Sequence, residues 1–222
     1  RSYMLVGGMP EAVATYTETG SYRYSSDIVN EIIQGYQDDF AKYGAKANPL
    51  LLRQTLISVA HQAGAKFVYS RVEGQYRSAE VKVALEMLKD AGLIIPTYHT
   101  DANGVPLGAE INERVVKYLI HDTGVLLGIL GIDDDIDERI KEMMVADSID
   151  LVDKGHVAEM MAGLELIKYS SPQTRHQLYY WQNMNKGTCA EVDYVIARSG
   201  SIVPIEVKSG VKGSMSSMYS LM

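Results

Sequence analysis

The sequence has little cysteine, no long hydrophobic run and no excess of positive charge. A single cysteine among 222 residues excludes an internal disulfide framework and fits a reducing compartment, so we expect a cytoplasmic protein. No apolar run approaches the length that crosses a bilayer, so we expect no membrane partner. The formal charge of −7 argues against a protein that coats nucleic acid, because such proteins gain affinity by neutralising phosphates.

What remains is the composition of an ordinary soluble globular protein, with 46% hydrophobic and 22% charged residues. The chain has room for one large or two small domains. Gly7 and Gly8 lack the Gly-Lys-Ser/Thr continuation of a phosphate-binding loop, and no such loop occurs elsewhere in the sequence. We therefore expect this chain alone neither to bind nor to hydrolyse ATP.

The most informative stretch is a predicted β-hairpin near the C-terminus. Residues 192–196 and 202–207 are rich in β-branched side chains, and Ser199-Gly200 between them suits a tight turn. With that turn, Ala197 faces Ile202. Counting outward places Asp193 opposite Glu206 and Glu191 opposite Lys208, all on one face of the hairpin.

Two carboxylates directly across a ladder repel each other unless a cation or a proton lies between them. Asp193 and Glu206 therefore predict a site for Mg²⁺ or Mn²⁺, with Lys208 as a catalytic cation beside it. This order of Asp, then Glu-x-Lys, resembles the PD-(D/E)xK nuclease superfamily, which cleaves phosphodiesters with a metal ion. The alternative is a solvated sheet face that carries a Glu191–Lys208 ion pair.

Upstream of the hairpin, the periodicity predicts helices from Ser26, from Asn48-Pro49 and from Ser78 as a helix cap. Two short strands, 93–98 and 105–107, would follow as a wing. This order is that of a winged helix-turn-helix. The exposed charges of the third helix nearly cancel, so a structural or protein-docking role is at least as well supported as DNA binding.

The segment before the hairpin reads as the start of a nuclease-like core. A helix is predicted over 155–166 and a strand over 177–181. In such cores the first helix commonly adds a glutamate. Glu159 and Glu165 lie about 240° apart around a helix, so they cannot easily both face the hairpin. We choose Glu159 as the third metal ligand.

Segments along the whole chain resemble a prokaryotic family of AAA-type ATP-binding proteins with a C-terminal PD-(D/E)xK-like domain of unknown function. The segments that carry the resemblance are Tyr3–Val13, Tyr36–Phe40, Lys66–Ser70, Leu88–Ile94, Lys117–Gly124, Tyr179–Trp181, Ala190–Ile196 and Pro204–Gly210. The resemblance implies a P-loop core before Arg1, so that ATP would bind only in that missing portion. It also implies a mixed α+β fold in three parts.

The first part, 1–45, would be the last helical, lid-like portion of the ATPase module. The second, 46–125, would be the winged helix. The third, 126–222, would be a truncated restriction-endonuclease-like domain ending in a helix near 214–221.

Three classes of function remain open from the sequence. The first is a metal-dependent DNA nuclease or DNA-processing ATPase, with Asp193, Glu206 and Lys208 as the catalytic residues. The second is a catalytically inert DNA-binding module that uses the nuclease fold as a scaffold. The third is a protein-interaction domain that couples an ATPase to a partner.

Overall fold

A computed structural model describes residues 2–43, 48–131, 154–170, 177–183, 190–208 and 216–221. The single cysteine, Cys189, lies outside these residues. The fold is mixed α+β, as predicted. None of the helices in these ranges is long and apolar enough to cross a membrane.

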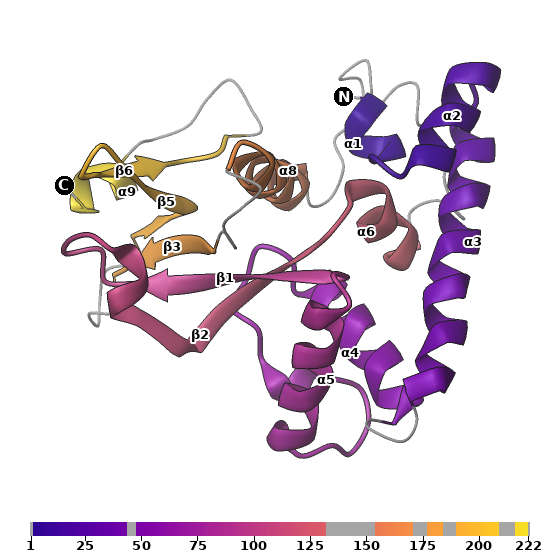
Figure 1. The fold of residues 1–222 in the computed structure, drawn as a ribbon, viewed down its shortest axis with the longest axis horizontal. Coiled ribbons are helices and arrows are strands. Elements are labelled where there is room, and N and C mark those ends of the chain that lie inside the picture. The colour runs from indigo at the N-terminus through magenta and orange to yellow at the C-terminus, as the bar shows by residue number, and fades with distance from the viewer. Residues whose placement is uncertain are drawn as a thin grey trace.

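The N-terminal part is helical and consists of α1 (Ser2–Val6), α2 (Pro10–Thr19), α3 (Tyr22–Phe40) and the short 3₁₀ turn η1 (Ala41–Tyr43). Helix α3 begins at Tyr22 and not at the predicted Ser26, because the Ser21 side chain accepts the backbone N–H of Tyr24 and caps the helix there. Its buried side, with Val29, Ile33 and Phe40, faces the rest of the molecule. Helix α3 forms the outer edge of the fold in Figure 1.

The middle part contains α4 (Pro49–His61), η2 (Tyr69–Arg71), α5 (Ser78–Asp90), β1 (Ile94–Thr100), η3 (Leu107–Glu110), β2 (Ile111–Ile120) and α6 (Thr123–Ile129). Asn48 caps α4, with the N–H of Leu50 2.9 Å from Asn48 Oδ1. The elements of the predicted winged helix, helices followed by a β-hairpin, are present. The cap of α5 differs, because Glu80 accepts the N–H of Arg77 and Ser78 is the first helical residue.

The second wing strand was predicted over 105–107, and this is wrong. That segment leads into η3, whose Leu107 is buried in a small hydrophobic cluster. The strand that pairs with β1 is β2, in the antiparallel register Ile94 to Ile120. The wing is therefore longer than predicted and ends directly before α6.

The C-terminal part contains α8 (Lys154–Lys168), β3 (Leu178–Gln182), β4 (Glu191–Val192), β5 (Tyr194–Arg198), β6 (Ser201–Ile205) and α9 (Ser216–Leu221). Helix α8, strand β3 and helix α9 lie where they were predicted. Strand β3 joins the wing, with Tyr98 beside Tyr179 in a parallel ladder, so that one sheet has the order β2-β1-β3-β4. This sheet crosses the predicted boundary between residues 125 and 126, as Figure 1 shows.

The hairpin β5–β6 has the predicted register, with Ala197 opposite Ile202. Ser199 and Gly200 have φ angles of 52° and 78°, as a two-residue turn with both residues in the left-handed region requires. The ladder ends at the pair Tyr194 and Ile205. Strand β4 pairs with β3 instead of continuing along β6, so Glu191 lies opposite Gln182 and not opposite Lys208.

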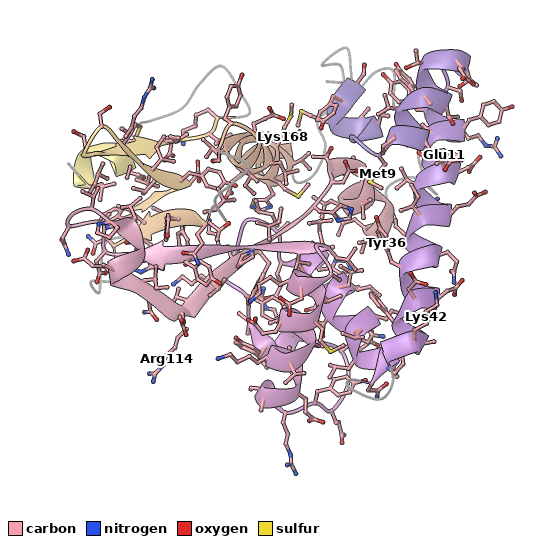
Figure 2. All side chains as sticks on the ribbon, viewed as in Figure 1. Met9, Glu11, Tyr36, Lys42, Arg114 and Lys168 are labelled. Carbon is pink, nitrogen blue, oxygen red and sulfur yellow. The ribbon has the colours of Figure 1, made fainter. Side chains whose placement is uncertain are left out.

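One hydrophobic cluster extends through the three predicted parts. It contains buried side chains from α3, α4, α5, β2, α6, α8 and β5. Tyr36 of α3 lies between that helix and α6 (Figure 2), and its hydroxyl is 3.2 Å from His121 Nε2. The cluster therefore packs the helices against one another and joins them to the strands through β2, α8 and β5.

Candidate functional site

One face of the four-stranded sheet carries a row of polar side chains. The strand registers place Thr97 beside Lys117, His99 beside Tyr180, and Gln182 beside Glu191. Directly paired residues project from the same face, and so do alternate residues of one strand. The centre of this face is buried, with Tyr180 fully covered and Lys117 and His99 nearly so, whereas Gln182 and Glu191 are partly exposed.

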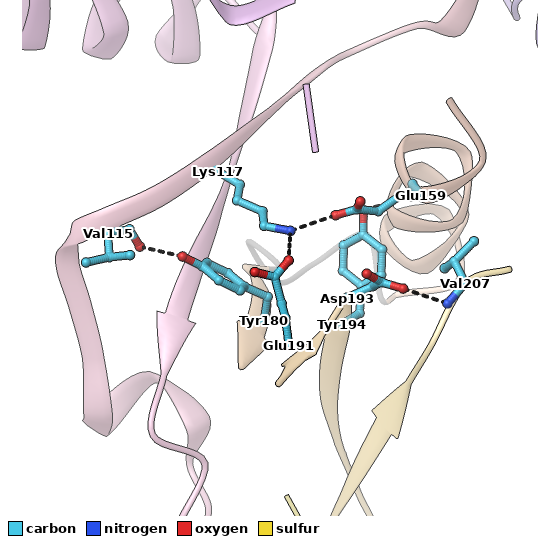
Figure 3. A network of polar contacts seen from close by, with 8 residues as sticks. All are labelled: Val115, Lys117, Glu159, Tyr180, Glu191, Asp193, Tyr194 and Val207. Atoms are coloured by element: carbon cyan, nitrogen blue, oxygen red, sulfur yellow. Dashed lines mark hydrogen bonds and ion pairs between the residues drawn. The ribbon is translucent and has the colours of Figure 1, made fainter. Parts of the chain in front are cut away.

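Lys117 lies at the centre of this polar face. Its side chain is 2% exposed, and its Nζ lies 3.0 Å from Glu159 Oε1 and 2.5 Å from Glu191 Oε1. The ammonium also lies 5.0 Å from the centre of the Tyr180 ring, within the range of a cation–π interaction. Figure 3 shows Lys117 reaching from β2 between Glu159 of α8 and Glu191 of β4.

Glu159 is the helical glutamate that faces the hairpin, as chosen from the sequence. Its side chain is buried, and its backbone carbonyl accepts the hydroxyl of Tyr194 at 2.8 Å. Glu165 points away and is paired with the exposed Lys168. The partner of Glu159 is Lys117, however, and sequence reasoning did not identify this lysine as a site residue.

The other three predicted site residues lie at the base of the hairpin. Asp193 occupies a bend between β4 and β5, and its Oδ2 accepts the backbone N–H of Val207 at 2.7 Å. Glu206 and Lys208 form an ion pair with each other. The Glu206 side chain is only 9% exposed, and its Oε2 is buried without a hydrogen-bond partner among the described residues.

The pKa shifts show that these groups act on one another. Burial raises the pKa of Asp193; the Val207 N–H opposes this, and the charge of Glu206 adds to the increase. Burial also raises the pKa of Glu159, and Lys117 offsets this only in part. For Lys117, burial favours the neutral form, but the two glutamates outweigh it and the pKa is raised.

Lys117 and Glu191 also influence Asp193, so the polar face and the base of the hairpin form one electrostatic network. Its carboxylates outnumber its ammonium groups by four to two, which leaves two negative charges in excess in the ionised state. The members are Glu159, Glu191, Asp193, Glu206, Lys117 and Lys208.

The donor set fits a divalent cation in part. Asp193 and Glu206 fit, because magnesium is commonly bound by one or two carboxylates plus water, and Glu206 Oε2 has no partner among the described residues. Glu159 does not fit as the third ligand, because Lys117 holds its carboxylate. Within the described ranges, no group of three or more His, Cys, Asp and Glu side chains is placed to hold a metal ion.

The ion pair between Glu191 and Lys208, which the alternative of a solvated sheet face required, is not formed. Glu191 binds Lys117, and Lys208 binds Glu206. The reason is the bend at Asp193, which directs β4 towards β3. The predicted site residues are therefore brought together, but with different partners from those expected.

Two family comparisons cover most of the chain. Residues 1–136 match a domain of unknown function, DUF8612, and residues 154–222 match a second domain of unknown function, DUF4143. A search of the curated proteins and a search of the solved structures gave no match. The C-terminal region is thus a domain of unknown function, as predicted, and Lys117 lies in the first matched region whereas Glu159 and Glu191 lie in the second. Because the first match covers more than half of the residues, the chain belongs to the DUF8612 family.

Proposed function

We propose that this chain is the portion of a prokaryotic AAA-type ATP-binding protein that follows the P-loop core, and that its C-terminal region cleaves DNA with a divalent cation. The observation that supports this function best is the excess of carboxylates in the partly buried network. Two uncompensated negative charges in a partly buried site are unfavourable, and one Mg²⁺ or Mn²⁺ ion would balance them.

Asp193 and Glu206 would hold the cation, which would activate a water and stabilise the charge on a phosphate. The chain's own groups have separate tasks. The Val207 N–H fixes the Asp193 carboxylate through Oδ2, which leaves Oδ1 for another contact. Lys208, at the exposed rim of the site, is placed to attract a phosphate group while it orients Glu206.

The first prediction tests cation binding. Isothermal titration of the chain with Mn²⁺ should show one site, and Asp193→Asn should weaken its affinity at least about tenfold, because a charged ligand is lost. Glu165→Gln is the control, since it also neutralises one carboxylate, but this glutamate of α8 contacts Lys168 outside the network. If Asp193→Asn and the wild type bind Mn²⁺ with equal affinity, Asp193 is not a ligand and the proposed cation site is wrong.

Nicking of supercoiled plasmid provides the functional readout. With Mn²⁺ present, the wild-type chain and Glu165→Gln should nick the plasmid, whereas Asp193→Asn should not. DNA is expected to reach the site through the hairpin region and not through α5, because Lys89 of α5 is already paired with Glu86. This pairing leaves the helix without a strong basic face.

The second candidate function is a catalytically inert scaffold that couples the ATPase to a protein partner. Two observations favour it. Lys117 already forms an ion pair with Glu159, and a groove of about 820 Å³ lies beside β5. Apolar residues such as Leu166, Leu178 and Val195 line this groove. A folded wild-type chain that binds no Mn²⁺ and nicks no plasmid would favour the scaffold.

A further inference from the structure

The groove of about 820 Å³ lies between the second half of β5 and the beginning of β3. It touches the consecutive residues 195–198 of β5 and the consecutive residues 177–179 at the start of β3. Side chains of a strand alternate between its two faces, so a groove that touches every residue of a segment meets the edge of that strand. Strand edges therefore form two of the walls of the groove.

The edge of β5 that faces away from β6 carries free backbone groups. In a hairpin with a two-residue turn, the flanking residues, here Arg198 and Ser201, form a hydrogen-bonded pair, and the pairs then alternate along the ladder. Ala197 and Val195 therefore point their N–H and C=O groups away from β6. Pro204 stands opposite Val195 and agrees with this alternation, because a proline cannot donate a hydrogen bond into the ladder.

Strand β3 does not use these groups. The ladder between β3 and β4 ends at Trp181 and Val192, and β5 continues from the bend in a separate two-stranded sheet. Within the described ranges no backbone hydrogen bond joins β5 to β3. The outward groups of Val195 and Ala197 can thus pair with an extended peptide that adds to β5 as a further strand.

The side chains of the groove add an apolar surface and one charge. Leu166, Leu178 and Val195 supply apolar contacts. Tyr169, directly after α8, also lines the groove and is 89% exposed, although large aromatic rings are usually more covered. Arg198 is the one charged residue in the lining, and it forms no ion pair within the described part of the chain. Tyrosine and arginine are the residue types that most often anchor protein interfaces.

These features favour a peptide over a small apolar acid. An acid of that kind would use the apolar surface and Arg198, but it would leave the backbone groups of β5 unpaired. An extended peptide with an acidic side chain satisfies all three. The groove is a local positive site on a chain whose formal charge is −7, so a carboxylate of a partner complements it.

We propose that the groove binds an extended segment of a partner protein. The segment pairs its backbone with the edge of β5, packs apolar side chains into the groove and places an acidic side chain against Arg198. The inference deepens the second candidate function, the scaffold, and rests on that function for the existence of a protein partner. It requires no cation.

The probe is a library of random heptapeptides displayed on phage and selected on the immobilised wild-type chain in EDTA. At about 3.3 Å per residue, a heptapeptide covers the whole length of β5. The selected sequences should converge on an acidic residue combined with alternating apolar residues. A selection that enriches no sequence above an empty support would overturn the proposal.

Fluorescence polarisation then measures the affinity of the selected peptide. Ala197→Pro removes the outward N–H and keeps the ladder with β6, so binding should weaken at least about tenfold. Arg198→Glu should also weaken it at least about tenfold, because attraction becomes repulsion. Arg114→Glu is the matched control, since this exposed arginine of β2 points away from the fold in Figure 2 and lies outside the groove. Equal affinities for all these proteins would mean that the peptide binds elsewhere.

Modified peptides cover the case in which Ala197→Pro fails to fold, which circular dichroism melting would reveal. Two copies of the selected peptide, methylated on alternate sets of backbone nitrogens, keep every side chain. The copy methylated on the edge that faces β5 should bind the wild type at least about tenfold more weakly, because its donors are lost. Unchanged binding of both copies would show that the backbone of β5 is not used.

Sedimentation identifies a competing occupant. If the wild-type chain forms a dimer that Ala197→Pro dissociates, a second copy occupies the edge of β5 and the proposal is wrong. The outcomes also separate the groove from the scaffold function. A chain that nicks plasmid and still selects a groove-dependent peptide overturns the inert scaffold alone, whereas a chain that does neither overturns the groove alone.

Discussion

At the scale of single residues, Gly163 allows α8 to approach the hairpin. An added Cβ at this position would lie 2.7 Å from Leu119 Cδ1 and would also overlap the hydroxyl of Tyr194. Tyr194 is fully buried, and its hydroxyl binds the carbonyl of Glu159 one turn earlier in α8. Gly163 thus sets the distance at which Glu159 meets the polar face of the sheet.

The second prediction compares two helical glycines. Gly163→Ala should lower the free energy of unfolding by about 1–3 kcal/mol, because overpacking outweighs the better helix propensity of alanine. Gly35→Ala in α3 should raise it by about 0.5–1 kcal/mol, because an added Cβ there meets nothing within 4 Å. Urea denaturation measures both variants, and a stabilised Gly163→Ala would contradict the close packing.

Single residues also show how far the sequence could predict the site. Asp193, Glu206 and Lys208 could be predicted as candidates because β-strand alternation and a two-residue turn relate positions that are close in the chain. Lys117 was missed, because its partners are 42 and 74 positions away and depend on a ladder between distant strands. A signal existed: Lys117 interrupts the otherwise apolar second half of its strand, residues 115–120, where a charge needs a partner.

At the scale of elements, Asp122 joins the N-terminal helices to the end of the wing. Its Oδ1 accepts the N–H of Val125 at 3.0 Å and caps α6, and its Oδ2 accepts the N–H of Gly8 at 2.6 Å. Gly7 has a φ of 76° and lies against the same carboxylate, where a side chain would not fit. Asp122 follows Lys117 by five positions, so the loop at Gly7 and Gly8 lies near the end of β2, the strand that carries Lys117.

The third prediction concerns this connection. Asp122→Ala should lower the free energy of unfolding by about 2–3 kcal/mol, because a buried helix cap and a half-buried hydrogen bond to Gly8 are lost together. Asn48→Ala at α4 is the matched control, with one exposed cap bond and an expected loss of about 1 kcal/mol. Similar losses in the two variants would mean that the bond to Gly8 contributes little.

The elements themselves were largely predictable, with exceptions that have local causes. The helices and the β5–β6 turn follow from periodicity, caps and a Ser-Gly pair. The second wing strand was misplaced, because a short apolar segment, 105–107, looked like a strand although Leu107 belongs to a 3₁₀ turn. The bend at Asp193 was not predicted, because its cause is the bond from Val207 and the pairing of β4 with β3.

At the scale of the whole molecule, buried tyrosines make the free energy of unfolding depend on pH in the alkaline range. The chain has 15 tyrosines. Burial raises the pKa values of Tyr118, Tyr180 and Tyr194 above the ordinary range. In the unfolded chain these groups lose their protons near about pH 10, whereas in the folded chain they keep them.

The fourth prediction follows from this difference. Above about pH 10 the folded state binds more protons than the unfolded state, so stability should fall as pH rises, by up to about 1.4 kcal/mol per pH unit for each such tyrosine. Urea denaturation between about pH 8 and about pH 11 measures the slope. Tyr118→Phe should make it shallower, and a slope unaffected by this change would show that Tyr118 does not contribute. Tyr24→Phe, on the exposed surface of α3, controls for loss of a hydroxyl group.

The parallel ladder between β1 and β3 limits how this gene can be recombined. Strand β1 is an interior strand, with β2 on one side and β3 on the other. A chimera that exchanged the C-terminal region for an unrelated one would leave the edge of β1 open to pairing with other chains. It would also separate Lys117 from both of its partners. We therefore expect a chimera to fold only when the two matched regions are exchanged together.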